Sequence, residues 1–230
     1  MVFATGIVAS CAAPVSQTPR VASTATAAPA PPGPVVFDVN RWRVVERESG
    51  PVNYYRVVTE DGRSFVRSEY RPPYETTVLG YELDAQTRET ARGLSWKWRA
   101  LTLPKGGDEC ASGRGDSAAV VYVSWRRGLR YYTIKYVWSA VGRKGSVCDQ
   151  KRNPFVAQDT VILETGETNV WKSERIDLHA EFLRHFADGD DTNVPSFVGV
   201  GIMSDGDQTG SASSADFADF QVSTSVAPRK

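Results

Sequence analysis

The chain has no surplus of either charge, because 27 Lys and Arg residues balance 27 Asp and Glu residues among its 230 positions. A chain without a basic surplus lacks the electrostatic footprint that attracts nucleic acids or anionic membrane surfaces, so neither is an expected partner. No apolar run reaches the ~18 residues that a membrane-spanning helix requires.

The signatures of common catalytic machinery are also missing. The sequence contains no Gly-x-Ser-x-Gly, no His-Glu-x-x-His and no phosphate-binding loop. Its two histidines, His179 and His185, have no nucleophile motif beside them, which favours a surface or capping role. We therefore assign no catalytic residue from the sequence, and whether the protein is an enzyme stays open, with a non-enzyme preferred.

Cysteine is scarce, and the first of the three cysteines suggests a cellular location. The segment Val8-Ala9-Ser10-Cys11 resembles a bacterial lipobox, in which the cysteine is acylated and becomes the mature N-terminus. Residues 1–11 would then be a lipoprotein signal remnant, although the positive charge that begins a signal peptide is missing. Ala12 and Ala13 follow without an Asp, which favours the outer membrane or periplasm of a bacterial cell envelope. The alternative is a chance apolar start with one free thiol.

Residues 12–34 are rich in Ala, Pro and Thr and contain no aromatic residue, so they are predicted to form a disordered tether. Residues 35–226 are predicted to form a single domain. In an exported domain the two remaining cysteines, Cys110 and Cys148, are expected to form a disulfide. Two unpaired thiols in a cytosolic protein are the alternative. The spacing of Cys and His does not fit a zinc site.

The domain is predicted to be mostly β. Runs rich in β-branched and aromatic residues alternate with turn signals, and Asp61-Gly62 is a strong hairpin signal. The central stretch, residues 93–138, contains three such runs and four of the six tryptophans. One helix is expected, capped by Asp177, with Leu178, Phe182 and Phe186 on one face and Asp188-Gly189 as its stop. These patterns favour an antiparallel β-sandwich of the jelly-roll type with one short helix.

Several landmarks in this order resemble an uncharacterised, exported bacterial family known as domain of unknown function 3047. They include residues 94–98 (Leu-Ser-Trp-Lys-Trp), residues 115–119 (Gly-Asp-Ser-Ala-Ala) and residues 201–209 (Gly-Ile-Met-Ser-Asp-Gly-Asp-Gln-Thr). The resemblance covers most of residues 35–225 and implies a β-sandwich similar to carbohydrate-binding modules. It implies no activity.

A calcium site is one hypothesis from the acidic residues. Asp205 and Asp207 lie two apart in a Gly-rich loop, and Asp219 follows, which offers the hard oxygen ligands that Ca²⁺ prefers. No other cofactor is expected. The alternative is a solvated turn whose Asp side chains bond local amides.

A glycan-binding face is a second hypothesis. Because strand side chains alternate, Trp96, Trp98 and Trp138 are expected in the core, and the opposite faces become available for a ligand. Acidic residues of the loop between the strands can add contacts to sugar hydroxyls, and a solvated face and loop are the alternative. The predicted ligand-binding residues are Lys97, Arg99, Asp108, Asp116, Tyr131 and Lys135.

These features favour a lipid-anchored, non-catalytic β-sandwich that binds carbohydrate or a cell-envelope protein. One alternative is a hydrolase or lyase acting on glycans, for which Glu164, Glu167 and Glu174 can supply a carboxylate pair. The other alternative is a structural protein of envelope assembly.

Overall fold

The computed structural model describes residues 33–45, 54–73, 76–187 and 192–225. The chain divides into two units, residues 1–30 and 31–230, and all the described residues belong to the second. The predicted lipidation site Cys11 and nearly all of the predicted tether lie outside the described residues. Within them, no helix combines the length and apolar character needed to cross a membrane.

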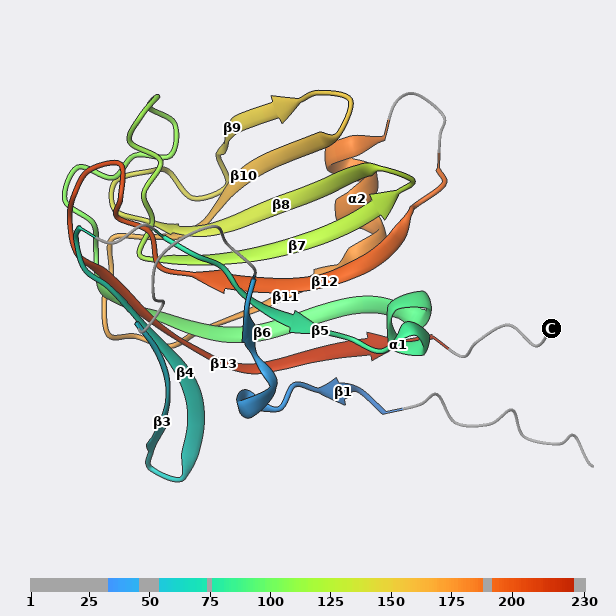
Figure 1. The fold of residues 1–230 in the computed structure, drawn as a ribbon, viewed down its shortest axis with the longest axis horizontal. Coiled ribbons are helices and arrows are strands. Elements are labelled where there is room, and N and C mark those ends of the chain that lie inside the picture. Colours follow the sequence, from blue (N-terminus) through green and yellow to red (C-terminus); the bar gives the residue numbers. More distant parts are fainter. Residues whose placement is uncertain (1–32, 46–53, 74–75, 188–191, 226–230) are drawn as a thin grey trace, which may run out of the picture. The chain divides into compact units, whose positions relative to one another are not determined.

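Two β-sheets form the layers of the fold (Figure 1). Sheet A has the strand order β11-β6-β13-β4-β3, and β1 also pairs with β13. Its strands are β1 (Val35–Val36), β3 (Tyr55–Glu60), β4 (Arg63–Tyr70), β6 (Ala91–Thr102), β11 (Lys172–Asp177) and β13 (Ser213–Thr224). Sheet B has the order β2-β5-β12-β7-β8-β10-β9. Its strands are β2 (Arg43–Val44), β5 (Leu79–Glu82), β7 (Ala119–Arg127), β8 (Arg130–Ser139), β9 (Val147–Arg152), β10 (Val156–Thr165) and β12 (Ser196–Met203).

Local signals in the sequence explain several of these boundaries. Asp61 and Gly62 have φ angles of 50° and 74°, and this pair of positive values is what a primed turn between β3 and β4 requires. In β13, Asp219 has a φ of 54° and lies in a register shift against β6. This bulge lets Phe217 and Phe220 both reach the core although they are three residues apart.

The inner faces of both sheets form the main hydrophobic core. Trp96 and Trp98 of β6 pack edge to face, and Trp98 meets Trp138 of β8 with ring centroids 5.7 Å apart. All three tryptophans are buried, which confirms their predicted place in the core. Large apolar rings from two facing sheets therefore supply the burial that stabilises the sandwich.

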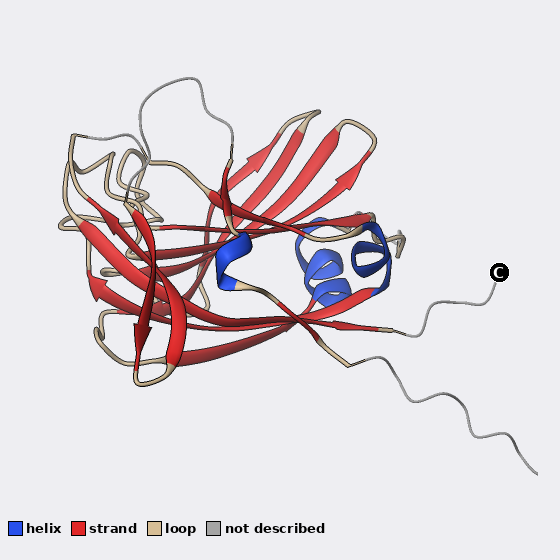
Figure 2. Cartoon of the chain, turned by 60° about the horizontal axis from the view of Figure 1, so that its bottom comes forward, coloured by secondary structure: helices blue, strands red, loops and turns tan. Residues whose placement is uncertain are grey.

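Helices lie at one end between the two strand layers (Figure 2). Helix α2 (Leu178–Phe186) begins as predicted after Asp177, whose carboxylate caps it by accepting hydrogen bonds from two backbone amides of its first turn. Its buried face carries Phe182, which packs against Trp125 and Tyr132 of sheet B. Helix α1 (Ala85–Thr90) and the short 3₁₀ turn η1 (Val39–Arg41) were not predicted from the sequence.

Two features of sheet B also differ from what the sequence predicted. Strands β8 and β10 run parallel, because the chain forms the edge strand β9 between them, whereas the other pairings are antiparallel. Strand β9 was missed because it is highly polar, which is common for a protected sheet edge. The fold class itself, a mostly β sandwich of the jelly-roll type, is confirmed.

Candidate functional site

A disulfide joins Cys110 to Cys148, with their Cα atoms 4.9 Å apart and a separation of 38 positions along the sequence. The predicted pairing is therefore confirmed. Only Cys110 lies in a loop, however, because Cys148 belongs to the edge strand β9. The bond fastens the segment after β6, which we call the disulfide loop (residues 105–117), to the far edge of sheet B.

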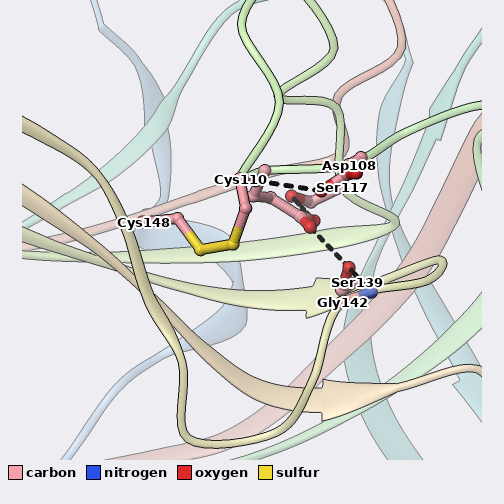
Figure 3. The surroundings of a disulfide bond; sticks show 7 residues. Asp108, Cys110, Ser117, Ser139, Gly142 and Cys148 are labelled. Carbon is pink, nitrogen blue, oxygen red and sulfur yellow. Dashed lines mark hydrogen bonds between the residues drawn. A yellow bond between two sulfur atoms is a disulfide. The ribbon is translucent and has the colours of Figure 1, made fainter.

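The neighbouring carboxylate of Glu109 anchors the disulfide loop a second time, through Ser117 and Ser139, which are labelled in Figure 3. Its Oε1 accepts a hydrogen bond of 2.6 Å from the Ser117 hydroxyl, and its Oε2 accepts one from the Ser139 hydroxyl. Ser139 in turn accepts a bond from the Gly142 amide. Because Glu109 is buried and bonded through both oxygens, it holds the loop in one position.

A cleft of about 530 Å³ lies between the disulfide loop and the outer face of sheet B, the face directed away from sheet A. Strands β7, β8, β9 and β10 supply its floor, and the loop supplies one wall. We call it the outer cleft. Its lining comprises Glu109, Cys110, Ala111, Ser112, Gly113, Gly115, Tyr122, Lys135, Asp149, Lys151, Gln158, Thr160 and Gln208.

Lys135 is the most buried cation of the outer cleft. Its ammonium lies 3.6 Å from the Asp205 carboxylate, and only 11% of its side chain is exposed. Burial works to lower the pKa of Lys135, but the surrounding acidic groups, Tyr122 first and then Asp205 and Glu109, outweigh burial and raise it. Lys135 therefore stays protonated and can donate hydrogen bonds into the cleft.

Two further groups of the cleft have unused hydrogen-bonding capacity. Within the described residues, the buried hydroxyl of Thr160 has no hydrogen-bond partner, and no bond joins the side-chain amide of Gln158 to another group. Buried polar groups usually find a partner, so a ligand or water is expected at these positions. The charged residues of the lining balance, since Lys135 and Lys151 face Glu109 and Asp149.

Three carboxylates meet beside the outer cleft. One oxygen each of Asp116, Asp205 and Asp207 lies within 4.8 Å of the others. Burial raises the pKa of Asp205 to about 6, although the positive charge of Lys135 opposes the shift. Asp116 accepts hydrogen bonds from the Thr209 amide and hydroxyl, at 2.7 and 2.6 Å, and so ties the loop after β12 to the disulfide loop.

The structure separates the predicted ligand-binding residues into four places. Lys135 and Tyr131 lie on the outer face of sheet B, whereas Lys97 and Arg99 lie on the outer face of sheet A. Asp116 belongs to the carboxylate cluster. Asp108 lies at the turn of the disulfide loop, where its carboxylate accepts a bond from the Cys110 amide.

The predicted metal ligands are also divided. Asp205 and Asp207 lie together, but Asp219 is in β13 and forms an ion pair of 3.0 Å with Lys97. Asp116 takes its place in the cluster. The signal was weak in the sequence, because Asp116 precedes Asp205 by almost 90 positions and only the tertiary pairing brings them together.

Sequence reasoning missed several residues of the outer cleft, among them Tyr122, Gln158 and Thr160. Alternation alone placed Lys135 on an outward position of its strand, but the register between the strands was unknown. That register pairs Tyr122 with Lys135 and Lys135 with Thr160, which puts three functional side chains in one row.

His185 lies in the interior, although a surface or capping role was expected. Its Nδ1 is 2.8 Å from Asp159, and only 5% of its side chain is exposed. Asp159 also accepts a bond of 2.7 Å from Arg152, so this group joins helix α2 to sheet B. The contact is structural, because it lies on the inner side of the sheet.

The Glu174 carboxylate, one of the suggested pair, accepts a hydrogen bond from the Trp98 indole. Burial raises the pKa of Glu174, and the nearby Glu164 charge adds to the shift. None of the three suggested glutamates lines the outer cleft. A larger cavity of about 790 Å³ lies beside α1 and α2, and residues 192–197 form part of its lining.

Comparisons with known proteins give weak structural likenesses. A family 11 carbohydrate-binding module of Clostridium thermocellum has 8% identity and a TM-score of 0.44, with coverage of 86% of this chain and 98% of that chain. The xyloglucanase domain of NopAA from Sinorhizobium fredii has 12% identity and a TM-score of 0.42, with coverage of 83% and 97%. Endoglucanase 3 of Trichoderma harzianum has 9% identity and a TM-score of 0.45, with coverage of 86% and 96%. Likenesses of this strength carry no argument about the site or the reaction of this chain.

The sequence comparisons give a family but no characterised relative. A search of curated proteins finds no match to the chain. A family model described as "Protein of unknown function (DUF3047)" matches residues 40–221, which is most of the chain and includes every residue of the outer cleft. The chain therefore belongs to the DUF3047 family, as the landmarks in its sequence suggested.

Proposed function

We propose that the protein binds carbohydrate without chemical conversion and that the sugar occupies the outer cleft. One observation carries the proposal: rigid strands direct the Thr160 hydroxyl, which has no partner among the described residues, into one cleft together with Gln158 and Lys135. Sugars present hydroxyl groups that both donate and accept hydrogen bonds, so they match a lining that contains an ammonium, an amide and a hydroxyl.

The charge of the lining supports a neutral ligand. Lys135 and Lys151 are offset by Glu109 and Asp149, so an anion such as a phosphate gains little net attraction. The floor also lacks the large apolar area that a lipid tail requires. A neutral polyhydroxylated ligand satisfies the polar groups without introducing a charge.

The state of the ionisable groups supports binding over catalysis. The pKa of Lys135 is raised by the acidic groups around it, and burial raises the pKa of Tyr122, so neither is a base near neutral pH. Glu109 uses both oxygens to hold serines. Lys135, Tyr122 and Glu109 therefore offer donors and acceptors in fixed positions rather than a base for a lyase.

The lipid anchor at Cys11 and a location in the bacterial cell envelope remain predictions from the sequence. They fit a domain with a disulfide, because such bonds persist in oxidising compartments. An envelope protein is the alternative ligand. Radiolabelled palmitate incorporation into the wild type, compared with Cys11→Ser, tests the anchor, and equal labelling of both proteins would contradict it.

A glycan array with the purified protein tests the function. Gln158→Ala is expected to weaken binding about tenfold through the loss of an amide that faces the cleft. The matched control is Gln221→Ala, which removes the same side chain from sheet A and is expected to leave binding unchanged. Absence of binding to every glycan would overturn the proposal, and an envelope protein captured in its place would support the alternative.

A second candidate function is glycan hydrolysis at the carboxylate cluster. The observation that favours it is Asp205, whose pKa of about 6 suits a general acid, beside Asp207 in a neighbouring cleft of about 390 Å³. Release of reducing ends from soluble polysaccharides, lost in Asp205→Asn, would establish this activity. Binding without any release of reducing ends would leave the non-catalytic proposal standing.

Calcium binding also stays a prediction, with Asp116 in place of Asp219. Lys135 works against a cation here, since its ammonium faces Asp205. The measurement is the melting temperature in calcium chloride and in EDTA, for the wild type and for Asp207→Asn. A wild type indifferent to EDTA would remove the calcium hypothesis.

A further inference from the structure

The outer face of sheet B continues beyond the outer cleft as a row of polar side chains. Along β8, Thr133 and Tyr131 follow Lys135 on the same face, because strand side chains alternate. Strand β7 places Ser124 opposite Thr133 and Arg126 opposite Tyr131. We call this row, from Lys135 to Tyr131, the β8 lane. At ~3.3 Å per residue its four steps span about 13 Å.

The middle of the lane can bond hydroxyl groups. The hydroxyls of Ser124 and Thr133 lie 3.0 Å apart, and both residues remain partly exposed. Strand β10 adds Gln158, which pairs in register with Thr133. The middle of the lane therefore shares Gln158 with the outer cleft, and the two surfaces are continuous.

The far end of the lane is aromatic. Tyr131 is 40% exposed, and the guanidinium carbon of Arg126 lies 5.2 Å from its ring centroid. An exposed aromatic ring at the end of a polar lane offers a surface on which a sugar ring can stack.

We propose that the β8 lane binds a linear glycan lengthwise, with its first sugars in the outer cleft and a later sugar on the ring of Tyr131. This rests on the proposed carbohydrate-binding function and extends it from a sugar to a chain. A ligand confined to the outer cleft does not reach Tyr131, whereas an extended chain along β8 contacts both ends. The affinity therefore depends on the number of sugar units.

Calorimetric titration with named probes tests this. The probes are cello-, xylo- and chito-oligosaccharides, each as disaccharide, tetrasaccharide and hexasaccharide. In the wild type, affinity is expected to rise with length for the series that binds. Tyr131→Ala should weaken the hexasaccharide about tenfold and leave the disaccharide unchanged, because only the longer chain reaches the ring. Tyr131→Phe keeps the ring and should retain the length dependence.

Two controls distinguish a loss of binding from a loss of folding and from an unspecific surface effect. Tyr131 is largely at the surface, so Tyr131→Ala should melt at the wild-type temperature, and Val141→Ala removes an exposed side chain elsewhere without an effect on binding. Wild-type affinity that does not depend on oligosaccharide length, or an equal loss of affinity for all lengths in Tyr131→Ala, would contradict binding along the β8 lane but not binding in the outer cleft. If the wild type bound none of these probes, binding along the β8 lane would be rejected. If it also bound no glycan on the array, the proposed carbohydrate-binding function would be rejected as well.

Discussion

On the outer face of sheet A, the buried Asp216 carboxylate accepts hydrogen bonds from Arg67 at 2.6 Å and from Arg99 at 2.7 Å. Both guanidinium groups also bond Glu60, and Trp171 lies 4.8 Å from that of Arg99. On the outer face of sheet B, the ammonium of Lys135 has Asp205 at the longer distance of 3.6 Å, and the nearby Thr160 hydroxyl has no partner in the described structure.

The difference between the two faces is whether the chain satisfies its own polar groups. Asp216, Arg67 and Arg99 lie directly opposite one another on β13, β4 and β6, so they neutralise each other and leave little for a ligand. The groups of sheet B come from strands whose register directs them into the outer cleft, where the Thr160 hydroxyl has no partner among the described residues. Polar composition alone therefore does not distinguish the two faces, whereas an unpaired polar group beside a cleft does.

The largest effect is expected from breaking the network of sheet A. Asp216→Ala leaves two arginines without their buried partner and should lower the free energy of unfolding by about 3–5 kcal/mol. The measurement is urea denaturation followed by tryptophan fluorescence. Asp216→Asn, which keeps the shape and loses the charge, should be less damaging and provides a folded variant if the alanine variant does not fold.

The matched control for that network is Asp219→Asn, which tolerates the positive φ of this position and removes only an exposed ion pair with Lys97. Its cost should stay below about 1 kcal/mol. Equal losses for the two variants would mean that the buried network contributes no more than a surface pair.

The next effect concerns the wall of the outer cleft. Replacing Cys110 and Cys148 together by Ser should lower the free energy of unfolding by about 2–4 kcal/mol, because the unfolded chain gains freedom. Glycan affinity should fall as well, since the disulfide loop lines the cleft. A reductant should reproduce both losses in the wild type and leave the double variant unchanged. Glycan binding insensitive to reduction would show that Glu109 and its two serines hold the loop without the disulfide.

A smaller effect depends on pH and comes from Asp205. Its pKa in the folded protein is about 6 against an ordinary value of 3.8, so the folded state favours the protonated acid. The stabilising contribution is therefore complete below about pH 4 and is lost as the pH rises through about 6, by at most about 3 kcal/mol. Relative to the wild type, Asp205→Asn should gain stability between pH 4 and pH 7. A difference that is constant with pH would contradict the raised pKa.

The fold was largely predictable from local patterns. The Asp177 cap, the spacing of Leu178 and Phe182, and the Asp61-Gly62 turn are encoded within a few residues, so helix α2 and the first hairpin follow from the sequence alone. Helix α1 is too short to show a helical period, and β9 has no apolar alternation.

The candidate site was less predictable, because it depends on register between distant strands. Lys135 was identified from the sequence. Its register neighbour Thr160 and its ion-pair partner Asp205, however, depend on how distant strands and loops pair in the fold. Lys97 showed the same alternation as Lys135, yet the topology places it on the other sheet. A pattern within one strand gives the face of a side chain, but not the sheet to which that strand belongs.

The smallest effect is expected at Lys97, and it is the sharpest test of the comparison. Its ion pair with Asp219 is exposed, so Lys97→Ala should cost less than about 1 kcal/mol and leave glycan affinity unchanged. Lys135→Met, which nearly keeps the length of the side chain and removes its charge on the other face, should weaken binding about tenfold or more, since it removes the donor at the floor of the cleft. If Lys97→Ala weakened binding as much as Lys135→Met, the ligand would contact the outer faces of both sheets. The internal pairing of polar groups on sheet A would then no longer distinguish it from the binding face of sheet B.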